Sequence, residues 1–246
     1  MRENPSFALE DVAEIRRLVD ENPWATIVSG TGAGLVASHY PVLLDPDRDD
    51  LTLLTHVGRP DERIHELGQR DGADGEVLVV IQGPHGYVSP GWYDADPAVP
   101  TWNHVSAHLT CRVEILSPEE NLRVLGQLVD RFEDRMPEPR RMAGTVADAA
   151  YSARISAGTV GLRLVATRFV AKAKLSQNKP PHVVERVLHE LEHGAEYPNP
   201  ALAAEMRRAQ ARAADAPAAD ASTADADADA AADAAPTPSA TAESPE

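Results

Sequence analysis

The sequence predicts a mainly β protein, an antiparallel barrel with helices at its periphery. Several runs of six or more residues are rich in β-branched and aliphatic side chains, as strands are. A glycine-rich segment at residues 30–34 joins two of these runs as a hairpin would. The predicted helices do not alternate regularly with the strands, which argues against a parallel β/α fold.

Each element has its own sequence pattern. Val12, Ile15, Leu18 and Val19 have the spacing of one helical face. Pro118 starts another helix, because proline is tolerated in the first turn and the carboxylates that follow favour the positive end of the helix dipole. The predicted strands cover residues 24–29, 35–44, 51–57, 76–82, 106–116 and 160–174. The predicted helices cover residues 9–21, 60–67, 118–132, 181–193 and 200–212.

The chain is expected to divide into a domain at residues 1–195, a helix at 196–212 and a tail at 213–246. The 246 residues include 43% from the hydrophobic set, enough for one domain with a substantial core. The tail has eight acidic residues and no Lys or Arg, and it alternates Asp with Ala, so we expect it to be disordered.

Charge and cysteine usage limit the partners and the compartment. The net charge is −16, and −8 remains without the tail, so direct binding to DNA is not expected. The only cysteine is Cys111, which excludes an internal disulfide. The chain has neither a signal peptide nor a long apolar run, so we predict a cytoplasmic protein that does not enter a membrane.

Three motifs resemble dinucleotide-binding or metal-binding motifs, but the surrounding sequence does not support these functions. The glycines at 30–34 are followed by a predicted strand, whereas a dinucleotide-binding loop needs a helix there. His189 and His193 form the string H-E-x-x-H, but they lie opposite the apolar helix face and no third ligand follows at a suitable spacing. His104 and His108 on a strand would lie about 13 Å apart. We therefore expect no metal site.

Two segments combine rigid turns with aromatic side chains. Residues 83–93 and 99–104 contain Trp92 and Trp102, together with the polar residues Ser89, Thr101 and Asn103. An apolar wall with a few fixed polar groups is typical of a ligand pocket, here for a planar ring. The alternative is that these residues plug one end of the barrel.

Two other segments carry cations and hydrogen-bond donors. Residues 172–180 include Lys174, Ser176, Gln177 and Asn178, which suit a phosphate or a polar ring edge, although an exposed basic turn is the alternative. At residues 55–61 a strand leads into a helix, and His56, Arg59 and the free amides of the helix start are expected to cradle an anion.

Taken together, five ordered blocks resemble the motifs of the PaiB family over about residues 1–208. The blocks are residues 37–45 (ASHYPVLLD), 56–59 (HVGR), 83–93 (GPHGYVSPGWY), 99–103 (VPTWN) and 174–180 (KLSQNKP). The resemblance implies an FMN-binding split β-barrel, similar to pyridoxamine-phosphate oxidases and flavin reductases. It also implies a homodimer with FMN at the interface and a role as a negative transcriptional regulator. Asp61 stands where that family usually has asparagine, and a carboxylate that faced a phosphate would weaken binding.

The resemblance and the residue types together give roles to the candidate residues. The phosphate is assigned to His56, Arg59, Lys174 and Ser176. The isoalloxazine ring is placed against the loops of Trp92 and Trp102, with Gln177, Asn178 and Asn103 as donors and His39 facing the ring. No catalytic residue is assigned.

Three functions stay open at this stage. The first is a regulator that acts through bound flavin, although the sequence contains no basic recognition helix. The second is an FMN-dependent oxidoreductase that uses NAD(P)H or a small substrate. The third is a barrel that has lost its flavin and serves as an interaction module, which Asp61 keeps open.

Overall fold

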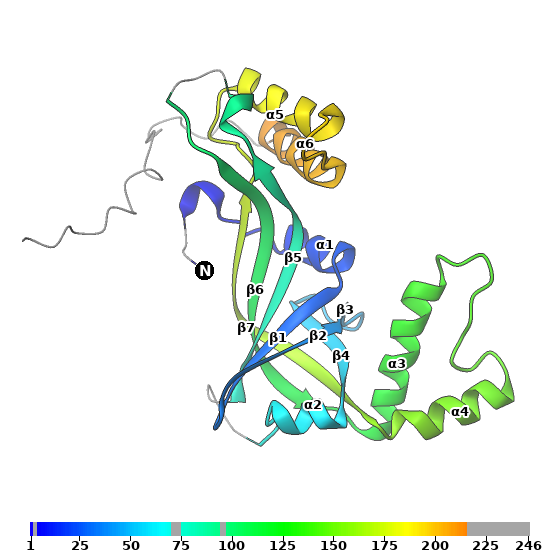
Figure 1. Ribbon diagram of the computed structural model, residues 1–246. Helices are drawn as coiled ribbons and strands as arrows, with labels where there is room; N and C mark the ends of the chain where they lie inside the picture. Colours follow the sequence, from blue (N-terminus) through cyan, green and yellow to red (C-terminus); the bar gives the residue numbers. More distant parts are fainter. Residues whose placement is uncertain (2–3, 70–74, 94–96, 216–246) are drawn as a thin grey trace, which may run out of the picture.

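Seven strands form one antiparallel sheet in the order β2-β1-β5-β6-β7-β4-β3 in the described part of the chain (Figure 1). The computed structural model describes residues 1, 4–69, 75–93 and 97–215, so most of the predicted tail lies outside it. The strands are β1 (Trp24–Thr31), β2 (Gly34–Pro41), β3 (Leu43–Leu44), β4 (Thr52–Gly58), β5 (Val77–Val88), β6 (Thr101–Ile115) and β7 (Thr159–Lys174). The predicted mainly β architecture is confirmed.

Helices surround this sheet. They are η1 (Pro5–Phe7), α1 (Val12–Glu21), α2 (Arg59–Ile64), η3 (Pro90–Trp92), α3 (Pro118–Glu133), α4 (Val146–Ser156), α5 (Pro181–His193) and α6 (Pro200–Asp215). The sequence did not predict α4, because its apolar side chains do not follow a helical stripe and Val146, Tyr151 and Ile155 are exposed. In the described part of the chain, no helix is both long and apolar enough to cross a membrane.

The two faces of the sheet differ. Along β1, β5 and β6 buried side chains alternate with partly exposed ones, so one face of each strand lies in the core. Ile27, Ile81 and Leu109 are among the buried residues of this inner face. Helices α1, α5 and α6 lie along one side of the long strands (Figure 1), and their apolar residues join the same core. We call the opposite side the outer face.

Strands β5 and β6 are longer than predicted. The segment with Gly83 and Pro84 was expected to be a rigid loop, but β5 continues through it to Val88, and β6 already begins at Thr101. The register shifts between Gln82 and His85, so Pro84 lies in a bulge and removes no ladder hydrogen bond. Gly83 and Pro84 therefore bend the strand without ending it.

The barrel is closed on one side by side chains, at a seam between β2 and β4. Thr55 Oγ1 donates to the carbonyl of Pro41 at 2.7 Å, and the amide of Gly58 donates to Tyr40 Oη at 3.1 Å. At the other end of the sheet α6 is attached to α1, where Arg17 forms two hydrogen bonds to Glu205 at 2.8 and 2.9 Å. A split barrel with an attached C-terminal helix pair results.

Candidate functional site

Tyr40 is at the centre of a cluster on the seam, which we call the seam site: Tyr40, His56, Gly58, Arg59 and Asp61. Its hydroxyl donates to Asp61 Oδ2 at 2.6 Å while it accepts the Gly58 amide. Its ring meets His56 edge-on, with centroids 5.8 Å apart. Burial, and then the carboxylate of Asp61, raise the pKa of Tyr40, so the hydroxyl stays protonated and holds Asp61. Sequence reasoning named His56 and Arg59 but missed Tyr40.

His56 supplies an unfilled hydrogen-bonding position in the seam site. Its Nδ1 is buried and has no hydrogen-bond partner. Burial lowers the pKa of His56, so the imidazole is neutral at pH 7. A buried polar atom without a partner is costly, and it marks a place where a bound group can complete the hydrogen bonding.

Gly58, Arg59 and Pro60, at the start of α2, do not offer the free amides that the sequence led us to expect. The Gly58 amide donates to Tyr40, the Arg59 amide donates to the carbonyl of Gly158 at 3.0 Å, and Pro60 has no N–H. The Arg59 side chain is half exposed, and its Nε donates to Ala157 at 2.6 Å. An anion here would therefore be held by side chains.

His65, at the end of α2, was not predicted. Its Nδ1 lies 2.8 Å from Ser29 Oγ and its Nε2 lies 3.0 Å from Ser38 Oγ, so it ties α2 to β1 and β2. Burial lowers the pKa of His65, opposed by Asp61. From the sequence alone, His65 looks like an exposed histidine at the end of a helix. Only its contacts with Ser29 and Ser38 show that it is buried and hydrogen-bonded.

The segment after β7 is used mainly for structure. Asn103 and Ser176 are 0% and 4% exposed, and Asn103 Nδ2 donates to Ser176 Oγ at 2.9 Å. Gln177 accepts from the Leu175 amide at 2.7 Å and donates to Ala173 at 2.6 Å. The side chains of Asn103, Ser176 and Gln177 therefore make hydrogen bonds within the chain, and their predicted contacts with the flavin stay predictions.

Lys174 and Asn178 lie nearer the surface of the same segment. Lys174 is half-buried at the end of β7, with Nζ 5.7 Å from the ring centroid of Phe7, and Asn178 is exposed.

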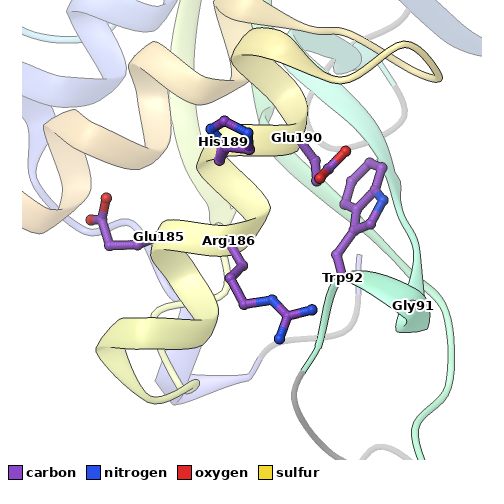
Figure 2. A pocket seen from close by; sticks show the side chains of 6 residues that line it. All are labelled: Gly91, Trp92, Glu185, Arg186, His189 and Glu190. Atoms are coloured by element: carbon purple, nitrogen blue, oxygen red, sulfur yellow. The ribbon is translucent and has the colours of Figure 1, made fainter.

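Trp92 and Trp102 do not form one wall. Trp92 lies against α5 and lines a pocket of about 360 Å³ with Glu185, Arg186, His189 and Glu190 (Figure 2). Trp102 is on the outer face of β6, against His85 and Tyr87. The carboxylates beside Trp92 make its pocket a poor place for a phosphate.

The remaining predicted residues are on three different elements. His39 on β2 is exposed and stacks on Trp24, with centroids 6.3 Å apart. Ser89 caps η3 by accepting from the Gly91 amide at 3.2 Å. Thr101 is the first residue of β6, opposite Val88.

The two predicted anion-binding segments lie at opposite ends of β7. His56 pairs with Gly161, whereas Lys174 pairs with His104. At about 3.3 Å per residue, Gly161 and Lys174 are roughly 40 Å apart along the strand. One chain therefore does not bring them together, and a site that uses both must use two copies.

The H-E-x-x-H string lies where the helical wheel predicts. His189 and His193 are exposed, with ring centroids 5.3 Å apart, while Val187, Leu188 and Leu191 are buried. Among the described residues, no three or more His, Cys, Asp or Glu side chains are grouped so that they could hold a metal ion.

Comparisons with known proteins agree with this architecture. The sequence profile of a family described as "Putative FMN-binding domain" matches residues 1–168. The chain is 28% identical to protease synthase and sporulation protein PAI 2 of Bacillus subtilis, over 81% of this chain and 93% of that protein. It is 27% identical to an uncharacterized protein of Saccharomyces cerevisiae, YKL070W, over 46% of this chain and 69% of that one.

Two solved structures share the fold. One is the FAD and heme binding protein from Mycobacterium smegmatis, with a TM-score of 0.50 and 19% identity over 68% of this chain and 73% of that one. The other is the flavocytochrome Anf3 from Azotobacter vinelandii, with a TM-score of 0.50 and 13% identity over 70% of this chain and 72% of that one.

Proposed function

Because the chain belongs to the FMN-binding family whose profile it matches, we propose that it holds FMN between two copies of itself and acts as a flavin-dependent regulator. The predictions of the family and of FMN as cofactor are confirmed by that match. The residues that hold FMN, the dimer and the regulatory role are proposals. FMN, when bound, supplies electron and hydride transfer, and the chain supplies binding and orientation.

The residues of the seam site fit the phosphate of FMN. Arg59 brings a guanidinium, which suits phosphate oxygens, and His56 brings a buried nitrogen without a partner. Asp61 is the unfavourable neighbour, but its carboxylate accepts the hydroxyl of Tyr40. We assign the phosphate to Arg59 and His56 on these grounds.

The proposal of a shared site rests on the distance between the two predicted anion-binding segments. Lys174 lies at the far end of β7 from His56, so the two contribute to one FMN only if they come from different chains. The outer face supports pairing: the side chains of Val28, Leu78, Val80 and Val170 share this face by their register and are partly exposed.

A complementation experiment tests the shared site. Arg59→Ala and Lys174→Ala chains are each expected to bind FMN at least tenfold more weakly than the natural chain. When the two variants are mixed and exchange subunits, each mixed dimer regains one intact site, so about one quarter of all sites should bind normally. Mixing that restores nothing would show that one chain holds FMN alone, and normal binding by the Lys174→Ala chain before mixing would show that Lys174 takes no part.

The negative charge favours indirect regulation over direct contact with DNA. The chain carries a net charge of −16, and a surface of this sign repels phosphate backbones. We therefore propose that flavin binding acts through another protein. Retention on promoter DNA that falls steeply with salt would contradict this.

An FMN-dependent oxidoreductase is the second candidate. Trp102 is 56% exposed on the outer face, so a flavin ring stacked on it would stay accessible to a substrate. Loss of the flavin absorbance band near roughly 450 nm on addition of NADH or NADPH would select the enzyme.

We also propose a cytoplasmic location and one domain at residues 1–195 with the C-terminal helix packed on it. Cys111 is the only cysteine in the sequence, so the chain forms no internal disulfide, as suits a protein in a reducing compartment. Helix α6 packs against α5 and β5, which supports treating it as an attachment to that domain.

A further inference from the structure

Four aromatic rings form a continuous ladder at one end of the outer face. His85 stacks on Trp102 with centroids 6.3 Å apart, Trp102 meets Tyr87 edge-on at 6.4 Å, and Tyr87 contacts Tyr197 at 5.3 Å. We call these four residues the aromatic ladder. Trp102 is 56% exposed and Tyr197 is 62% exposed, so the ladder presents ring surface to solvent instead of filling the core.

The loop between α5 and α6 is fixed in a way that places Tyr197 on the ladder. Asn199 Nδ2 donates to the carbonyl of His85 at 2.9 Å. A Cβ at Gly86 would lie 3.0 Å from side-chain atoms of both Asn199 and Leu202, so glycine at residue 86 suits the close approach of these side chains to β5. Tyr197 itself has φ +57°, a left-handed backbone conformation that residues other than glycine rarely adopt.

A cationic strip adjoins the ladder on the same face. It consists of Lys172 and Lys174. His104 connects it to the ladder, because His104 pairs directly with Lys174 and lies two residues from Trp102 on β6. Both lysine ammonium groups lie over the ring of Phe7, at 5.4 and 5.7 Å from its centroid. Burial, and then Lys172, Lys174 and His85, lower the pKa of His104, so the charges that act on it are positive.

From this juxtaposition we infer a binding site for a planar aromatic ring that carries an anionic group, with the ring on the aromatic ladder and the anion on the cationic strip. Exposed aromatic rings bind flat ligands by stacking, and ammonium groups bind carboxylate or phosphate oxygens. Tyr197, Lys172 and Lys174 lie beyond residues 1–168, the part that the family profile matches. The inference shares Lys174 with the two-chain FMN site proposed above, and it does not depend on the assignment of the FMN phosphate to the seam site.

Two sources of such a ligand are possible, the flavin itself and a second aromatic anion such as a substrate. Both share one chemistry, so a neutral and an anionic probe of the same shape test the site. We would titrate the full chain, free of flavin, with 2-naphthoate and with 2-naphthamide by calorimetry at low salt. The anion should bind at least tenfold more tightly than the amide.

Variants of single residues separate the two parts of the site. Lys172→Gln should remove most of the preference for the anion, whereas Trp102→Ala should weaken both probes at least fivefold. Tyr197→Gly removes a ring and suits the left-handed backbone, so it should weaken binding without lowering the melting temperature. Tyr151→Ala is the matched control, because Tyr151 on α4 is also 56% exposed and lies 5.2 Å from a cation, Arg154.

Repeating the titration with FMN-saturated protein identifies the source. Loss of naphthoate binding would mean that the flavin occupies the aromatic ladder. Unchanged binding would mean that the ladder binds a second ligand. Both outcomes support a binding site at the ladder. The inference is overturned if naphthoate gives no heat, if the amide binds as tightly as the anion, or if Trp102→Ala has no more effect than Tyr151→Ala.

Discussion

At the scale of single residues, the Asn103 and Ser176 pair shows a structural role for two side chains that the sequence also offers as ligand contacts. Ser176 has φ +62° and its hydroxyl lies 2.9 Å from the amide of Asn103, beneath Met206 of α6. The pair joins the end of β7 to β6. A buried amide that loses its partner pays the cost of desolvation without compensation.

Ser176→Ala should therefore lower stability and leave FMN affinity unchanged. We expect a loss of about 1–3 kcal/mol in the free energy of unfolding, because the Asn103 amide is left unsatisfied. Urea denaturation and a flavin titration of the same variant check the two halves. Ser156→Ala, which removes an exposed hydroxyl at the end of α4, is the control. A Ser176→Ala chain with the stability of the natural chain but weaker FMN binding would show that Ser176 contacts FMN.

Asp61 provides a second residue-scale prediction. Asp61→Asn removes a negative charge next to Arg59 and His56 and keeps an acceptor for the hydroxyl of Tyr40. If the FMN phosphate binds at the seam site, its affinity should rise by about fivefold, on the order of 1 kcal/mol.

Fluorescence titration of FMN measures the effect of Asp61→Asn. Asp20→Asn, which alters a carboxylate paired with Arg131 on α3, should change nothing. Unchanged or weaker binding by the Asp61 variant would place the phosphate elsewhere.

Alternation along a strand explains which candidate residues the sequence could not sort. Trp102 and Asn103 are adjacent in the sequence, and the expectation of a loop there predicts that both contact one ligand. They are consecutive residues of β6, so one faces outward and the other faces the core. Had the strand been started at Thr101, the sequence alone would have separated them.

At the scale of elements, the attachment of α6 depends on charge as well as on apolar contact. Arg17 binds both oxygens of Glu205, which is almost fully buried, and also binds Glu14. Glu14 in turn is paired with Arg212 of α6. An ion pair shielded in this way is costly to break, because the remaining charge is left without its partner.

Arg17→Gln should loosen α6 and lower the free energy of unfolding by about 2 kcal/mol, less than for a fully buried pair because Arg17 is partly exposed. Hydrogen exchange should locate the faster opening in α6. A double-mutant cycle with Glu205→Gln isolates the pair. Arg48→Gln is the control, because Arg48 is an exposed arginine paired with Asp50. Equal losses of stability in the two arginine variants would show that the Arg17–Glu205 pair does not hold α6 in place.

Elements with strong periodicity were predictable, and those formed by long-range contacts were not. Helix α5 was predicted at residues 181–193 and observed at Pro181–His193, because five apolar residues mark its buried face. Helix α4 has no such stripe, and the extra length of β5 and β6 comes from their pairing with each other across a bulge. Pairing partners of this kind lie too far apart in the sequence for a local pattern to reveal them.

At the scale of the whole molecule, the long sheet separates two chemically different ends. The seam site combines a guanidinium and a neutral histidine with a carboxylate held by Tyr40, whereas the other end combines exposed rings with two lysines. The sequence predicts cations in both segments, but it does not show that the two segments lie at opposite ends of β7. Their separation along β7 is a property of the register, which fixes His56 opposite Gly161 and Lys174 opposite His104.

Burial of several histidines makes the stability of the whole chain depend on pH. Burial lowers the pKa of His56, His65, His104 and His108 from the model-peptide value of 6.5. Just below pH 6.5 the unfolded chain therefore binds more protons than the folded chain. The free energy of unfolding should fall as the pH drops below about 6.5, and it should be nearly constant above it.

Urea denaturation at pH 7.5, 6.5 and 5.5 tests this dependence, above the range in which carboxylates titrate. His65→Gln should be less stable at pH 7.5, because it loses its bonds to Ser29 and Ser38, and its stability should fall less between pH 7.5 and 5.5. His182→Gln, on the exposed start of α5, should retain the full dependence. A natural chain that is equally stable at pH 5.5 and 7.5 would mean that these imidazoles gain protons without unfolding, and hence that water reaches the seam site and the outer face.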